Sequence, residues 1–146
     1  MTDTTFWEYI DLIDWSQPDD ERIVKPLVAA LQRSGAESIM AFEAVMTNKL
    51  RALDTKAHAA HWSDERGRVR SVDSFLYARA AVVASGRKTY DAILEEPTHF
   101  PSDTTYEPLL EVANTAYKQL TGQPLPLAPT DASYETYHNR EGWLSL

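Results

Sequence analysis

An aspartate and two histidines stand close together near the middle of the chain, in the stretch ALDTKAHAAHW, as Asp54, His58 and His61. Carboxylate and imidazole groups are ligands that zinc and other divalent ions accept. On one helix, however, the three residues would spread over about 10 Å of axis, so a single ion would take two of them and need another ligand from elsewhere. We favour a structural role, in which Asp54 accepts a hydrogen bond from His58 and the histidines cap the last turn of the helix. No bound metal, cofactor or catalytic residue is predicted.

Arg79 is the second residue with a side chain that could take part in chemistry. It lies on the apolar side of a predicted helix, so its guanidinium should be partly buried and require a carboxylate partner. The candidates for that partner are Glu43, Asp54 and Asp73. The functional alternative is an anion pocket, in which Arg79, Tyr77 and His58 hold a carboxylate or phosphate and His58 transfers a proton. The candidate ligand-binding residues are therefore Asp54, His58, His61, Asp73, Tyr77 and Arg79.

The charges of the chain are unevenly distributed. The formal net charge is −8, which argues against nucleic-acid binding because contacts to phosphates need clustered lysine and arginine. The segment from Lys49 to Lys88 has nine basic and four acidic residues, so the rest of the chain carries −13. One interpretation is an ordinary solvated surface, and the other is an acidic face that steers a basic protein partner. The candidate partner-binding residues belong to the first two predicted helices and are Glu8, Asp11, Asp14, Asp19 and Asp20, together with Glu21.

The elements that carry these residues are predicted to be helices. Apolar residues recur at helical spacing, and no segment shows the sustained alternation of a strand. The pattern predicts an all-α single domain of about six helices over residues 1–122. The longest helix should run from about Ala36 to His61 and present Glu43, Asp54, His58 and His61 on one face. Another should begin near Asp20, leaving Pro26 less than two turns inside it, unless Pro26 kinks the helix.

Two segments lack a helical pattern. Residues 63–70, SDERGRVR, should form a mobile and mostly basic loop. Residues 123–146 form a proline-rich and aromatic tail, which begins with the extended stretch QPLPLAP and continues with Tyr134, Tyr137 and Trp143. We expect this tail to pack on or beside the helical domain. The alternative is that it folds on a partner.

The composition is that of a globular protein, with 43% hydrophobic and 25% charged residues among 146. No apolar run approaches the roughly 20 residues of a membrane span, and the acidic N-terminus is unlike a signal peptide. The chain has no cysteine, which excludes disulfides, thiolate zinc sites and cysteine nucleophiles. We expect a cytoplasmic protein that does not bind membranes.

Three stretches resemble a known family: FWEYIDLIDW, AFEAVMTNKLRALDTKAHA and VDSFLYARAAVVASGRKTYDAIL. They are similar to the bacterial family catalogued as domain of unknown function 4240, over roughly residues 5 to 120. Members carry a D-x-F-x-Y-x-R-like stretch before small residues and a glycine, and its counterparts here are Asp73, Phe75, Tyr77, Arg79 and Gly86. The resemblance implies an all-α fold and transfers no activity.

Two functions from different classes are compatible with these observations. The first is a non-enzymatic, acidic helical protein that binds another protein, as an immunity-type inhibitor or an adaptor would. The second is a small enzyme or ligand-binding protein centred on Asp54, His58 and Arg79. A polar cavity at those three residues would favour the second, and tight packing there would favour the first. We prefer the first, because the acidic helices are the one feature that indicates a partner.

Overall fold

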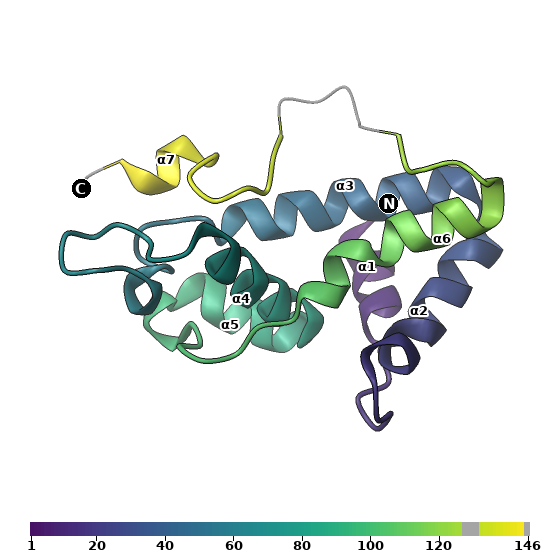
Figure 1. Ribbon diagram of the computed structural model, residues 1–146, viewed down its shortest axis with the longest axis horizontal. Helices are drawn as coiled ribbons and strands as arrows, with labels where there is room; N and C mark the ends of the chain where they lie inside the picture. The colour runs from purple at the N-terminus through teal and green to yellow at the C-terminus, as the bar shows by residue number, and fades with distance from the viewer. Residues whose placement is uncertain (127–131, 145–146) are drawn as a thin grey trace. The chain divides into compact units, whose positions relative to one another are not determined.

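The computed structural model describes residues 1–126 and 132–144, and this part of the chain is helical (Figure 1). The helices are α1 (Asp3–Ile10), α2 (Asp20–Ser34), α3 (Ala36–Ala52), α4 (Val72–Ala84), α5 (Arg87–Glu95), α6 (Val112–Thr121) and the short α7 (Arg140–Trp143). Three 3₁₀ turns connect them, η1 (Ala60–Trp62), η2 (Pro97–His99) and η3 (Glu107–Glu111). No strand occurs in the described ranges, where Ser63 and Val69 form an isolated bridge. The predicted all-α fold is confirmed. The stretch QPLPLAP lies partly outside the described residues.

The chain packs as two compact units. Unit 1 comprises Met1–Met46 and Pro108–Pro129, and unit 2 comprises Thr47–Glu107 and Thr130–Leu146. Helix α3 therefore contributes its first turns to unit 1 and its last turns to unit 2. None of the helices in the described part of the chain combines the length and the apolar character that a membrane crossing requires.

Unit 1 is built on α2, which packs against both α1 and α6. Helix α2 begins where the sequence predicted, because the Asp19 side chain accepts a hydrogen bond from the Arg22 amide and caps the helix. Pro26 is accommodated inside α2. The aromatic rings of Phe6 and Phe42 lie 5.0 Å apart between their centroids and are both fully buried. Such a pair adds to the stabilisation that burial of apolar area supplies.

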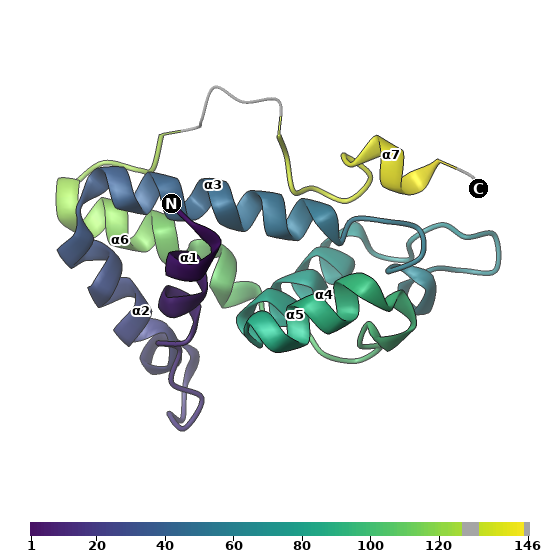
Figure 2. The ribbon, with the colours of Figure 1, turned by 180° about the vertical axis from the view of Figure 1, so that it is seen from behind.

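Unit 2 is built on α4, which is buried almost all round and packs against α5 (Figure 2). The Ser71 side chain caps α4 by accepting a hydrogen bond from the Ser74 amide. The small residues from Ala78 to Ala84 allow neighbouring segments to approach closely on several sides. The Tyr90 hydroxyl of α5 donates to the carbonyl of Lys49 at the end of α3, with 2.7 Å between the oxygens. Arg79 is the fully buried charged residue at the centre of α4.

The longest helix is shorter than the sequence predicted. Helix α3 ends at Ala52, and the residues up to Ala59 form turns before η1 begins. Two side chains divert the chain here: the Asp54 carboxylate binds backbone amides of residues 137 and 139, and the Thr55 hydroxyl accepts from the His58 amide. Short polar side chains that bond nearby or remote backbone in this way compete with the helix. The prediction that Asp54, His58 and His61 share one helical face is therefore wrong.

Unit 1 also contains a largely buried acid, Glu43 of α3. Its Oε2 atom is buried and finds no hydrogen-bond partner in the described residues. Burial first, and the nearby carboxylate of Glu111 second, raise the pKa of Glu43 from 4.5 to about 7. The folded state therefore binds this proton more tightly than the unfolded state does.

We predict that Glu43→Gln stabilises the protein above neutral pH. For an acid with a raised folded pKa, the unfolding free energy falls as pH rises from about 4.5 to about 7 and stays low above it. The neutral amide avoids this loss, by at most about 3 kcal/mol at pH 8. Denaturant unfolding from pH 4 to pH 8 measures the effect. The exposed Glu8→Gln is the control and should keep the wild-type fall in stability; an equal fall in Glu43→Gln would contradict the prediction.

Candidate functional site

Asp54, two residues after the end of α3, holds the C-terminal segment, residues 132–144, by three hydrogen bonds. Its side chain is 0% exposed. Oδ1 accepts from the amide of Tyr137 at 3.1 Å and from the indole nitrogen of Trp143 at 2.8 Å, and Oδ2 accepts from the amide of Asn139 at 3.0 Å. A buried carboxylate needs this number of donors to replace the water it has lost.

Arg79 of α4, which carries the opposite charge to Asp54, binds the same segment. It too is 0% exposed. Nη1 donates to the carbonyls of Leu50 and Tyr134, at 3.0 and 2.7 Å, and Nη2 donates to the Thr136 hydroxyl at 3.0 Å. The Thr136 hydroxyl in turn donates to the carbonyl of Val72 at 2.8 Å. The guanidinium thus joins the end of α3 to two residues of the C-terminal segment.

The partners of Arg79 differ from those that the sequence predicted. Its burial is confirmed, but its hydrogen bonds go to carbonyl and hydroxyl oxygens and not to Glu43, Asp54 or Asp73. The hydrogen bonds of the Asp54 carboxylate come instead from donors of the C-terminal segment, and those of Arg79 go to acceptors of that segment and of Leu50. Burial lowers the pKa of Arg79 to about 10, and the charges of Asp54 and Glu135 oppose the shift. Arg79 therefore stays cationic at neutral pH, although its Nε is buried without a hydrogen-bond partner among the described residues.

Arg51 and the main chain after Asp54 complete the contact. The Arg51 guanidinium donates to the carbonyl of His138 at 3.1 Å, and its own carbonyl accepts from the Asn139 side chain at 3.0 Å. The Lys56 amide donates to the carbonyl of Gly142 at 2.9 Å. A Cβ atom on Gly142 would lie 2.6 Å from the carbonyl oxygen of Asp54, so the approach requires glycine at this position. We call Arg51, Asp54 and Arg79 together the docking site.

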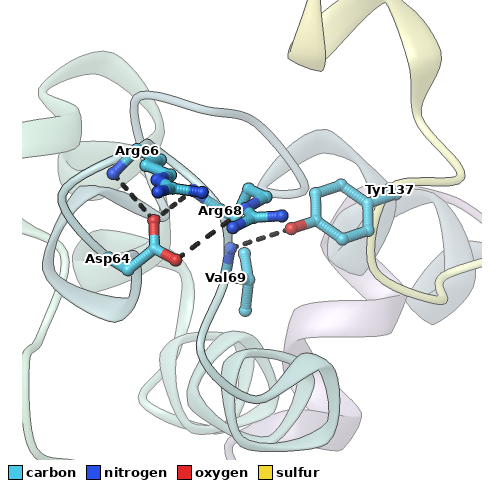
Figure 3. A network of polar contacts seen from close by, with 5 residues as sticks. All are labelled: Asp64, Arg66, Arg68, Val69 and Tyr137. Carbon is cyan, nitrogen blue, oxygen red and sulfur yellow. Dashed lines mark hydrogen bonds and ion pairs between the residues drawn. The ribbon is translucent and has the colours of Figure 1, made fainter.

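Tyr137 fixes the segment further. Its backbone has a φ of 76°, a left-handed conformation that is rare for a residue with a side chain. Figure 3 shows its hydroxyl directed at the backbone of Val69, whose amide donates to it at 2.8 Å. Its ring contacts that of Trp143, with 4.5 Å between the centroids. The strained backbone is therefore held from its amide, its hydroxyl and its ring.

Residues 63–70, predicted as a mobile basic loop, are organised by Asp64 (Figure 3). Its carboxylate accepts from the amides of Arg66 and Arg68, at 2.8 and 3.0 Å, and forms an ion pair with the Arg68 side chain at 3.9 Å. The Arg68 amide contributes most to lowering the pKa of Asp64. The side chains of Arg66, Arg68 and Arg70 are exposed, so the loop is basic as expected.

His58 is buried and does not bind Asp54, so the predicted hydrogen bond between them is wrong. Its Nε2 donates to the carbonyl of Ile93 at 3.0 Å, and its Nδ1 lies 2.7 Å from the Thr55 hydroxyl. Because a carbonyl only accepts, Nε2 carries the proton of the neutral ring. Burial lowers the pKa of His58, which favours this neutral form. Both ring nitrogens are engaged, and neither is open to a ligand or metal.

The remaining candidate ligand-binding residues form none of the docking-site hydrogen bonds described above. His61 of η1 and Asp73 of α4 are exposed, and Tyr77 is half-buried with a pKa raised by burial and by the carboxylate of Glu107. The described residues contain no group of three or more histidines and carboxylates that could hold a metal ion. Of the six candidates, the structure brings Asp54 and Arg79 within electrostatic reach. The ligand-binding roles of the six stay predictions.

The candidate partner-binding residues divide into two kinds. Asp14 and Asp19 have local tasks: hydrogen bonds from Ser16 and Gln17 lower the pKa of Asp14, and Asp19 caps α2. The others are exposed, namely Glu8, Asp11 and Asp20, together with Glu21.

Sequence reasoning missed the residues of the C-terminal segment that bind the docking site. Tyr137 and Trp143 were singled out as aromatic, but Thr136, Asn139 and Gly142 were not. A possible signal was the run of turn-forming and aromatic residues in ETYHNREGW, which no helix period explains. Hydrogen bonds between residues more than 80 positions apart, such as Asp54 and Asn139, do not affect the local periodicity from which helices are predicted.

We predict that Asp54→Ala lowers the unfolding free energy by about 3 kcal/mol or more. The substitution leaves three buried donors without an acceptor and removes a negative charge near buried Arg79. Urea unfolding measures the loss, and hydrogen exchange of the Tyr137 and Asn139 amides locates it. The control is Asp103→Ala, an exposed aspartate of unit 2, with an expected change within about 0.5 kcal/mol. Wild-type protection of both amides in Asp54→Ala would refute the assignment.

Comparison with known proteins identifies a family. Neither the curated proteins nor the solved structures contain a match to this chain. Residues 1–119 match a family described as protein of unknown function (DUF4240). The match includes Arg51, Asp54 and Arg79, and it ends before the C-terminal segment. Because it covers most of the sequence, this chain belongs to the DUF4240 family.

Proposed function

We propose that this protein is a non-enzymatic binding protein, of the immunity or adaptor type, whose unit 1 captures a basic protein partner. The observation that carries the proposal is a set of exposed carboxylates and exposed apolar side chains that follow one another closely in the sequence, from α1 to the first turn of α2. We name this set the acidic face, and it comprises Glu8, Asp11, Leu12, Trp15, Asp20 and Glu21. We also propose, from the sequence alone, that the protein is located in the cytoplasm.

The carboxylates of the acidic face support electrostatic capture. Within the described ranges, Glu8, Asp11, Asp20 and Glu21 form no ion pair, whereas neighbouring Asp19 pairs with Arg22 at 3.4 Å. Unpaired charges of one sign raise the local concentration of an oppositely charged partner and speed its association. Charge attraction sets the rate of encounter more than the strength of the final complex.

Two apolar side chains in the segment between α1 and α2 support a lasting contact. Trp15 is 52% exposed and Leu12 is 41% exposed. Tryptophan surrounded by polar residues is typical of the positions that dominate binding energy in protein interfaces. A shallow hollow of about 350 Å³ lies beside this segment, lined by Asp14, Gln17, Arg22, Lys25, Pro26 and Ala29. In the proposed complex, a side chain of the partner occupies this hollow.

The packing around Asp54 and Arg79 gives less support to the enzyme or ligand-binding alternative. Both side chains are fully buried, and their hydrogen bonds go to other parts of the chain. Both nitrogens of His58 are engaged as well. An anion would therefore have to displace the C-terminal segment before it reached Arg79.

We predict that neutralising the acidic face slows association with its partner. The variant combines Glu8→Gln, Asp11→Asn, Asp20→Asn and Glu21→Gln and leaves Asp14 and Asp19 to their local roles. Proteins retained by the wild type and lost by the variant are the candidate partners, and stopped-flow mixing then measures the association rate. We expect a roughly tenfold or greater decrease at low salt that disappears as salt is raised.

The matched control removes four exposed carboxylates from unit 2, by Glu65→Gln, Glu95→Gln, Glu96→Gln and Asp103→Asn. It changes the net charge by the same amount and should keep the association rate much closer to wild type. Equal slowing in both variants would mean that the association rate depends on net charge alone, which would contradict a binding role for the acidic face.

We predict that Trp15→Ala acts on the other rate constant. Loss of a large apolar contact raises the dissociation rate, with a cost of about 2 kcal/mol or more at an interface hot spot, and leaves association nearly unchanged. Surface plasmon resonance with the partner measures both rates. Met40→Ala, a similarly exposed apolar residue of α3, is the control. Wild-type dissociation of Trp15→Ala would exclude this residue as an anchor.

A further inference from the structure

We propose that the docking site is an exchangeable peptide-binding site, which holds the C-terminal segment of its own chain here and accepts the same segment from a second copy of the chain. The ligand class is a peptide that turns at Tyr137 and ends in the short helix α7, with threonine and tryptophan seven positions apart, as Thr136 and Trp143 are. This inference is independent of the acidic face.

The first argument is the way in which the segment is recognised. The site binds mostly main-chain groups: Asp54 accepts two backbone amides, while Arg79 and Arg51 donate to the carbonyls of Tyr134 and His138. The Lys56 amide adds a backbone contact to Gly142. Peptide recognition in other proteins shows the same division, with main-chain hydrogen bonds for affinity and a few side chains for specificity. Here the side chains are Thr136, which accepts a hydrogen bond from Arg79, and Trp143, which donates one to Asp54.

The second argument is that the docking site and the segment that fills it belong to different parts of the sequence. Arg51, Asp54 and Arg79 lie within residues 1–119, which match the family, whereas the segment lies beyond the match. The body of the protein therefore carries the site, and a separate piece of chain fills it. Asp54 and Trp143 are 89 positions apart, so no local turn imposes their contact.

The third argument is the number of hydrogen bonds that the docking site would lose if the segment left it. Without the segment, Asp54 would lose three donors, and Arg79 would lose two of its three acceptors. Departure of the segment gives up these hydrogen bonds and lets water reach both charges, and entry of another segment with the same groups restores the hydrogen bonds. A second copy of the chain supplies a segment that restores every contact, which is the condition under which protomers exchange identical elements.

The shape of the site restricts what can enter. Gly142 passes so close to the Asp54 carbonyl that a methyl group in its place would collide, and Tyr137 must adopt a left-handed backbone. These two requirements discriminate against peptides of other sequence. They also provide a variant that spoils the segment and leaves the site intact, namely Gly142→Ala.

The experiment uses the full chain and a fluorescein-labelled synthetic peptide of residues 132–146, ASYETYHNREGWLSL. In the wild type, the tethered segment competes with the peptide at a high effective concentration. The Gly142→Ala chain has a weakened competitor, so its apparent affinity for the wild-type peptide should rise at least about tenfold in fluorescence anisotropy. A labelled peptide that carries Gly142→Ala should not bind. The adjacent exposed Glu141→Ala is the matched control and should behave as the wild type.

A Gly142→Ala chain that keeps its helical circular dichroism and takes up no peptide would overturn the proposal. Should that chain fail to fold, the wild type with a protease site in place of residues 127–131 decides. After cleavage, excess labelled peptide should replace the bound segment, as native mass spectrometry detects. A folded, cleaved protein that never exchanges its segment would likewise overturn the proposal.

A mixing experiment tests the second copy as the source of the segment. The Gly142→Ala chain offers an intact site, and an Asp54→Asn chain offers an intact segment. Their mixture should form a one-to-one complex in size-exclusion chromatography with light scattering, which neither chain forms alone. Monomers in the mixture, with peptide uptake intact, would overturn exchange between copies.

Discussion

The burial of two opposite charges beneath the C-terminal segment is the constraint on which unit 2 depends. Asp54 and Arg79 are both withdrawn from water, and neither forms a direct salt bridge with the other. Each must therefore be solvated by the protein itself. The C-terminal segment supplies most of that solvation, with donors for the carboxylate and acceptors for the guanidinium. Folding of the segment and burial of the charges are thus one event.

Main-chain partners have a different consequence from a salt bridge. Nearly every residue offers a backbone amide and a carbonyl, so one alignment of the segment is selected by the side chains of Thr136 and Trp143, which bind Arg79 and Asp54. The left-handed Tyr137 and the close approach at Gly142 belong to that alignment. The arrangement leaves one polar atom, Nε of Arg79, unsatisfied within the described residues, which is compatible with a site that favours specificity over maximal stability.

The two units handle their carboxylates in contrasting ways. Unit 1 largely buries Glu43, whose Oε2 has no hydrogen-bond partner among the described residues and whose pKa rises accordingly. Unit 2 buries Asp54 with three donors and uses Asp64 to hold a basic loop in shape. Because the DUF4240 family carries no assigned activity, these contrasts are the main guide to what each unit does. The proposed encounter with a partner rests on the exposed carboxylates of α1 and α2, and the proposed capture of a peptide rests on the buried charges with main-chain partners.

The sequence by itself determined the all-α fold, the start of α2 at Asp20, the burial of Arg79 and the family, because helical periodicity, capping residues and local motifs are written in neighbouring positions. It could not determine where α3 ends. Local spacing favours a helix through His61, whereas the structure stops it at Ala52 and turns Asp54 toward amides of residues 137 and 139. The partners of Arg79 were likewise decided by tertiary structure, since carbonyl acceptors have no residue identity that a sequence pattern could reveal. Only the folded chain, which brings together residues 29 to 85 positions apart, carries those main-chain groups to the two buried charges.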